Sequence, residues 1–144
     1  MTLQETIRAM EQALTEEGFL GLKTPRMVQD HMKACPGLTL LFVNSLCGCA
    51  GIGARLGTKM ALEQSTYPPH HLITVFAGVD EEATEEIFKY AKPYPPSSPS
   101  IALFKDGELV HFIERHQLKG VDPVVIAKEV QQALYTHRVV EALA

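Results

Sequence analysis

The chain opens with apolar positions at helical spacing, which predict two helices. The first helix lies between Thr2 and Gly18, because its apolar residues recur every three or four positions. Thr24 followed by Pro25 is typical of the cap and first residue of a second helix, which ends before the turn residues at 35–37. The apolar positions of the first helix are Leu3, Ile7, Met10 and Leu14.

Two later runs, 38–43 and 71–78, are almost wholly apolar and too short for helices. Such runs are typical of strands that are buried on both faces of a parallel sheet. The pattern between them, from Cys47 to about Gln64, is helical. After the second run, we expect Asp80 to cap an acidic helix that reaches about Tyr90.

The last part of the chain predicts a hairpin and a closing helix. Asp106-Gly107 separates the strand-like segments 100–104 and 108–113, as in a two-residue β-turn. Asp122 and Pro123 open a helix through about Tyr135. We therefore expect one α/β domain over 1–144, with a mixed sheet, flanking helices and two additional N-terminal helices. The crossover predicts parallel strands, and the hairpin an antiparallel edge.

Composition narrows the class of protein. The 144 residues are 46% hydrophobic and 21% charged, with a net charge of −4 and no basic block, so we expect no nucleic-acid partner. Charged residues interrupt the N-terminus and no apolar run approaches the ~20 residues that span a bilayer, so we expect a cytoplasmic protein without a membrane partner. In the reducing cytosol, a close cysteine pair is more often catalytic or metal-binding than structural.

The Cys-Gly-Cys stretch at 47–49 follows the first buried strand and starts a helix. A helix N-terminus stabilises a thiolate, so Cys47 is the candidate exposed nucleophile and Cys49, within the first turn, the candidate resolving thiol. Gly48 lacks a Cβ and relieves part of the strain in a disulfide across one residue. The remaining strain predicts a more oxidising pair than a relaxed Cys-x-x-Cys.

Two other interpretations of the pair are a buried apolar role and a metal or iron–sulfur site. No third ligand is assigned, because Cys35 lies across a strand from the pair, and we expect it in a surface loop or half-buried. His111 is expected on the solvent side of its strand. Gly51, Gly53 and Gly57 are poor helix formers, so either something approaches this helix closely or its first turns are mobile.

Ser98-Pro99 comes immediately before a predicted strand, which suits a cis-proline turn. In this topology the turn would face the start of the Cys47 helix. Its backbone could then pair with an extended peptide or a thiol conjugate at the cysteine, which makes Ser98 and Pro99 candidate substrate-binding residues.

The order of elements, the cysteine pair and Pro99 before the hairpin resemble the thioredoxin-like fold. More closely, VNSLCGCAG, TVFAGVDEEAT and PPSSPSIALFKDGELVHFIERHQLKG resemble the bacilliredoxin family over nearly the whole chain. The resemblance implies removal of bacillithiol from mixed disulfides on cytosolic proteins. Cys47 would attack and take up the bacillithiol, and Cys49 or free bacillithiol would resolve the adduct.

The resemblance also implies no bound cofactor, with bacillithiol or another low-molecular-weight thiol as co-substrate and S-thiolated proteins as partners. Weak disulfide-isomerase activity is associated with this family. The alternatives are a general protein disulfide isomerase or reductase and, from another class, a metal or iron–sulfur carrier that uses Cys47 and Cys49.

Overall fold

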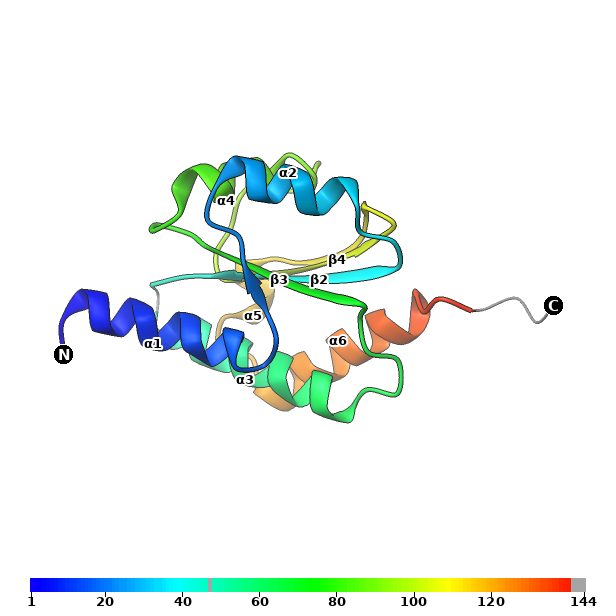
Figure 1. Ribbon diagram of the computed structural model, residues 1–144. Helices are drawn as coiled ribbons and strands as arrows, with labels where there is room; N and C mark the ends of the chain where they lie inside the picture. The colour runs from blue at the N-terminus through cyan, green and yellow to red at the C-terminus, as the bar shows by residue number, and fades with distance from the viewer. Residues whose placement is uncertain (47, 141–144) are drawn as a thin grey trace.

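The computed structural model describes residues 1–46 and 48–140, and for Gly48 and Cys49 only the backbone. A central sheet lies between two layers of helices, with α2 and α4 on one face and α1, α3 and α6 on the other (Figure 1). The helices are α1 (Leu3–Thr15), α2 (Pro25–Lys33), α3 (Gly48–Gln64), α4 (Glu81–Phe88), α5 (Arg115–Leu118) and α6 (Pro123–Thr136). The strands are β1 (Leu20–Gly21), β2 (Leu38–Asn44), β3 (His71–Phe76), β4 (Ser100–Lys105) and β5 (Glu108–Ile113).

The sheet is mixed, with strand order β1-β3-β2-β4-β5. β1, β3 and β2 run parallel, whereas β4 is antiparallel to both β2 and β5. The predicted crossover and antiparallel edge are therefore confirmed. None of the helices in the described residues is both long and apolar enough to cross a membrane.

β2 is the central strand, and each of its residues is buried. Leu40 and Phe42 pack into the core under α1, α3 and α6. Leu41 and Val43, on the alternate face, pack with the side chains of α2 and α4. The two-faced burial predicted from the apolar run is confirmed, and it fixes the register of β2, because a slip of one residue would exchange its faces.

Turn and cap chemistry explains the β4–β5 hairpin and the starts of three helices. Asp106 and Gly107 have φ of 51° and 82°, so the hairpin turn needs two residues that tolerate the left-handed region. Side-chain oxygens of Thr2, Thr24 and Asp122 accept backbone N–H groups at the starts of α1, α2 and α6. These caps match the sequence prediction.

Asp80 corrects one prediction. It occupies the cap position of α4 but makes no side-chain capping bond, and the helix ends at Phe88 rather than near Tyr90. Its carboxylate lies 3.2 Å from the Lys23 ammonium instead. The carboxylate therefore forms an ion pair with the segment after β1 and no side-chain cap for α4.

Burial corrects two further predictions. Cys35 is only 4% exposed and lies in the core, with its Sγ 3.4 Å from the Met32 carbonyl oxygen. Burial raises the pKa of the Cys35 thiol, which disfavours its thiolate. His111 is partly buried rather than wholly on the solvent side of β5: its side chain is 35% exposed, and its Nε2 lies 3.1 Å from the Glu129 carboxylate of α6.

The close approach inferred from the glycines of α3 occurs at Gly57. A Cβ built there would lie 2.8 Å from the Ile126 side chain and 2.8 Å from the Pro123 carbonyl oxygen of α6. A Cβ at Gly53 would meet nothing nearer than 3.8 Å. The absence of a side chain at Gly57 therefore sets the distance between α3 and α6.

Gly57→Ala should lower the free energy of unfolding by about 1–3 kcal/mol, because the added methyl overpacks the α3–α6 contact. Gly53→Ala is the matched control in the same helix. It should leave stability unchanged or raise it by up to ~1 kcal/mol through helix propensity. Urea unfolding of both variants measures the difference, and equal effects would show that the contact at Gly57 does not limit helix packing.

His31 makes stability depend on pH. Its Nε2 is buried without a hydrogen-bond partner, and its ring lies edge-on to His71 with centroids 5.5 Å apart. Burial, helped by the charge of His71, lowers the pKa of His31 from 6.5. The folded protein therefore favours neutral His31, and protonation is unfavourable only in the fold.

Well above pH 6.5, His31 is neutral in both states and does not affect the free energy of unfolding. As the pH drops below 6.5 towards the folded pKa, the unfolded chain binds the proton first, and the free energy of unfolding falls. Substituting His31→Phe should reduce the loss of unfolding free energy between pH 7.5 and pH 5.5. The control His116→Gln, at a largely exposed position, should keep the wild-type loss. Urea titrations at both pH values measure the effect, and an unchanged loss in His31→Phe would contradict it.

Candidate active site

The predicted cysteine motif falls at the junction between β2 and α3. β2 ends at Asn44 and α3 begins at Gly48, so a helix does start directly after the buried strand, as predicted. Cys47 lies outside the described residues, and the backbone of Gly48 and Cys49 forms the start of α3. The catalytic roles of Cys47 and Cys49 stay predictions, as does the role of Gly48.

Asn44 holds this junction with its side chain. It is 1% exposed, and its Nδ2 donates to the Met10 carbonyl oxygen of α1 at 3.3 Å. Its Oδ1 accepts from the Ser45 backbone N–H at 3.0 Å and from Arg55 Nη1 at 2.9 Å. One buried amide therefore connects α1, the end of β2 and the middle of α3.

Arg55 brings a positive charge to the same junction. The side chain is half-buried, and burial lowers the pKa of its guanidinium. Its hydrogen-bond partner is the neutral amide of Asn44, and no carboxylate among the described side chains forms an ion pair with it. Among the side chains that the structure describes, the charge of Arg55 therefore has no direct counter-ion.

The glycine at position 51 makes room for Arg55. A Cβ built on Gly51 would lie 3.0 Å from Arg55 Nη1. The guanidinium thus lies against the first turn of α3, one helical turn before its own position. A methyl group at position 51 would crowd the end of the Arg55 side chain, which would have to shift by a few tenths of an ångström.

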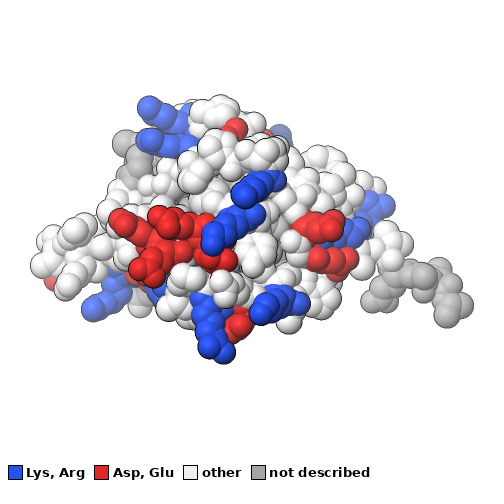
Figure 2. Space-filling model, turned by 90° about the horizontal axis from the view of Figure 1, so that it is seen from above, with Lys and Arg blue, Asp and Glu red and all other residues white. Residues whose placement is uncertain are grey.

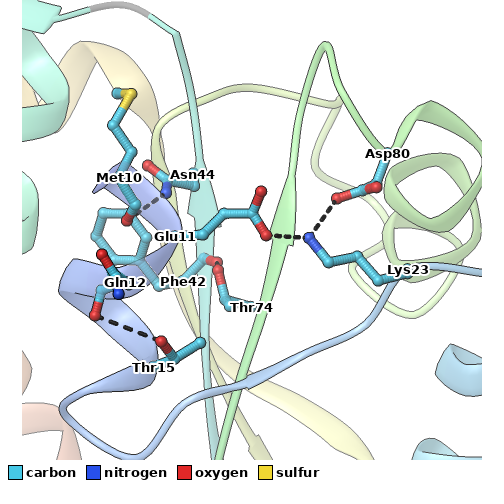
Figure 3. A network of polar contacts seen from close by, with 9 residues as sticks. All are labelled: Met10, Glu11, Gln12, Thr15, Lys23, Phe42, Asn44, Thr74 and Asp80. Carbon is cyan, nitrogen blue, oxygen red and sulfur yellow. Dashed lines mark hydrogen bonds and ion pairs between the residues drawn. The ribbon is translucent and has the colours of Figure 1, made fainter. Parts of the chain in front are cut away.

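A second polar network fixes α1 beside the junction. Lys23 makes ion pairs with Glu11 of α1 and with Asp80 before α4 (Figure 3). Burial lowers the pKa of Lys23, but the hydrogen bonds and charges of the two carboxylates outweigh it, so the pKa lies above its usual value. Together with the bond from Asn44 to Met10, this network holds α1 against the end of the sheet.

The Ser98–Pro99 peptide bond is cis, as the sequence predicted. β4 begins at Ser100, which pairs with Val43 of β2. The antiparallel register therefore places Pro99 at the same end of the sheet as Asn44. Pro99 is buried and Ser98 is half-buried. The turn and the cysteine motif therefore share one end of the sheet, and substrate binding by Ser98 and Pro99 stays a prediction.

Charge is distributed unevenly around this end. Acidic side chains gather over α4, whose sequence contains Glu81, Glu82, Glu85 and Glu86 (Figure 2). The loop before α4 contacts the junction, since a Cβ on Gly78 would lie 3.8 Å from the Leu46 side chain. The loop that precedes the acidic helix α4 therefore borders the junction on one side, and Arg55 of α3 borders it on the other.

Comparison with known proteins decides the family. A model of the disulphide isomerase family matches residues 3–138. A bacilliredoxin of Cytophaga hutchinsonii is 48% identical over 124 residues, which cover 86% of this chain and 90% of that protein. A bacilliredoxin of Halalkalibacterium halodurans is 42% identical over 135 residues, which cover 94% of this chain and 93% of that protein. The chain belongs to the bacilliredoxin family.

Solved structures agree with the fold of this bacilliredoxin family member. An oxidoreductase with a thioredoxin fold superposes with a TM-score of 0.61 at 12% identity, covering 79% of this chain and 91% of that one. Mitochondrial thioredoxin 3 of Saccharomyces cerevisiae gives a TM-score of 0.57 at 11% identity, and the match covers 86% of this chain and 98% of that one. The predicted thioredoxin-like fold is confirmed, and the family assignment makes the protein a thiol–disulfide oxidoreductase.

The sequence analysis assigned no structural role to two residues of this junction, Asn44 and Arg55. Asn44 ends an otherwise apolar strand, and that position alone is a weak signal for a buried polar junction. Arg55 lies four residues after Gly51, a spacing that places the two on one helix face.

Among the side chains that the structure describes, no group of three or more His, Cys, Asp or Glu could hold a metal ion.

Proposed function

We propose that this oxidoreductase removes bacillithiol from mixed disulfides on cytosolic proteins, with Cys47 as nucleophile and Cys49 as resolving thiol. The observation that carries the proposal is the position of the motif, because α3 begins directly after Cys47. Unpaired N–H groups and the partial positive charge at a helix start stabilise a thiolate. Bacillithiol is proposed as the small thiol because the similar proteins are named bacilliredoxins.

The reaction balances in two exchange steps. The Cys47 thiolate attacks the bacillithiol sulfur of the mixed disulfide, and the client protein leaves as a thiolate. The Cys49 thiolate then attacks Cys47, which forms the internal disulfide and releases bacillithiol as a thiolate. Two further molecules of the small thiol then reduce the internal disulfide by successive exchange, which restores both cysteines and releases the two small thiols as their own disulfide.

The Ser98–Pro99 turn is proposed to bind the substrate backbone. Ser100 Oγ donates to the Ser97 carbonyl oxygen at 2.8 Å, which fixes the turn at the start of β4. The register between β2 and β4 supports this role, since it brings the turn to the end of β2. The partners of the proposed reaction are S-thiolated client proteins and bacillithiol or another small thiol.

A general disulfide isomerase is the second candidate, because the matching family model bears that description. The two activities differ in substrate. A de-bacillithiolating enzyme acts on a protein joined to a small thiol, whereas an isomerase rearranges disulfides between protein cysteines. Both start with attack by the same thiolate, so the choice of substrate, rather than loss of a cysteine, separates them.

A client protein that carries one bacillithiol adduct tests the proposal by intact-mass spectrometry. The wild type should release bacillithiol, and Cys47→Ser should reduce release to the rate without enzyme, because the attacking thiolate is lost. Cys49→Ser should still attack and should accumulate one adduct per chain on Cys47. Cys35→Ala is the matched control, and it should keep wild-type turnover because that thiol is buried in the core.

The same client joined to glutathione, and a protein with scrambled disulfides, give the comparison substrates. Faster release of bacillithiol than of glutathione is expected. Faster repair of the scrambled protein would favour the isomerase. An adduct trapped on Cys49 would reverse the two roles, and a stoichiometric metal lost on Cys49→Ser would contradict the oxidoreductase mechanism in favour of a carrier.

A further inference from the structure

A hollow of about 250 Å³ lies between the end of α1 and the middle of α3. Its lining includes two cations of α3, Arg55 and Lys59, which are one helical turn apart. All of its lining residues lie outside the cysteine motif at 47–49. Ala13 and Leu56, which also line the hollow, are exposed to solvent, so a small molecule can reach it from solution.

Arg55 is held in place, but few of its hydrogen-bond donors are used. Its Nη1 donates to Asn44 Oδ1 at 2.9 Å, and a Cβ built on Gly51 would lie 3.0 Å from the same nitrogen. A guanidinium has several N–H groups, and the described residues offer Arg55 no second acceptor. A restrained side chain loses little conformational entropy when a ligand binds, and its unused donors can bind an anion.

The carboxylates that line the hollow do not neutralise Arg55. Glu17 forms an ion pair with Lys59 at 3.4 Å, so the charges of these two side chains offset each other. Glu16 is exposed, where salt and water screen its charge. The hollow therefore has one cation without a counter-ion among the described side chains, which favours a ligand with a single negative charge.

The remaining walls of the hollow are mainly apolar. Leu14 and Phe19 line it from the core, and Leu56 lines it at the surface. The Thr58 hydroxyl donates to the Ala54 carbonyl oxygen at 2.8 Å, so its proton is not available to a ligand. A planar carboxylate matches the fork of a guanidinium, and an apolar body matches these walls.

We propose that this hollow binds a small carboxylate with an apolar body, such as a short-chain aliphatic acid, and that Arg55 pairs with the carboxylate. A half-buried cation with only a neutral partner is incompletely compensated, so the anion adds a favourable interaction. The ligand site is additional to the proposed thiol chemistry and uses none of its residues.

Binding of butyrate, followed by NMR spectra of the backbone amides, tests the proposal. Butyrate should shift the signals of Phe19 and Leu56 until they saturate, with a Kd in the millimolar range for a ligand of so few atoms. Butyramide has the same body without the charge and should bind about tenfold more weakly. Arg55→Gln should weaken butyrate binding by a similar factor, whereas Arg26→Gln, at an exposed position on α2, should bind like the wild type.

Two variants at the exposed position Ala13 test the site with Arg55 intact. Ala13→Glu adds a carboxylate at the edge of the hollow, which should compete for Arg55 and weaken butyrate binding severalfold. Ala13→Gln has nearly the same size without the charge and should bind like the wild type. Thermal unfolding of each variant verifies the fold, and the Ala13 pair remains decisive if Arg55→Gln does not fold.

Any of four results would overturn the proposal: no saturable shift with butyrate, equal binding of butyramide, unchanged butyrate binding by folded Arg55→Gln, or equal binding by the two Ala13 variants. Sulfate that binds as tightly as butyrate would also contradict it, because the apolar walls would then contribute nothing. Each result leaves the proposed function standing, since release of bacillithiol from a client protein is measured separately.

Discussion

The buried amide of Asn44 is the interaction on which the arrangement of the site depends. The side-chain amide donates to the Met10 carbonyl oxygen and accepts from the Ser45 backbone N–H and from Arg55. The backbone carbonyl oxygen of the same residue accepts from the Ala77 N–H at 3.0 Å. Each of these groups would cost about 1–3 kcal/mol if left buried without a partner. The path of the chain from β2 into the cysteine motif is therefore fixed by one side chain.

The rest of the fold supports this junction from both faces of the sheet. β2 cannot slip, because Leu40 and Phe42 fill one core while Leu41 and Val43 fill the other. α3 cannot turn about its axis without losing the close contact of Gly57 with α6. The glycines that weaken α3 as an isolated helix thus have specific uses: Gly57 admits α6, and Gly51 admits the Arg55 guanidinium.

Sequence patterns predicted the elements whose signals are local. The apolar run of β2, the Asp106-Gly107 turn and the Thr24-Pro25 cap each depend on neighbouring residues, and each is confirmed. β1 and α5 were missed because each is very short, and β1 exists only by pairing with β3. No periodic pattern can arise in so few residues.

Predictions that depended on distant partners were less successful. Asp80 was expected to cap a helix, but Lys23 from another part of the chain takes its carboxylate. Cys35 was expected near the surface, but the fold buries it beside Met32. The site shows the same limit: its position at the start of α3 followed from the sequence, whereas the contact between Asn44 and Arg55 is made by folding.

Hydrogen–deuterium exchange of Asn44→Ala against the wild type tests most directly whether Asn44 holds the junction. We expect faster exchange in peptides that cover residues 44–55 and unchanged exchange in the hairpin at 100–113, because the variant removes the side chain that connects α1, β2 and α3. Unchanged exchange over 44–55, or a uniform increase through the hairpin as well, would contradict the account.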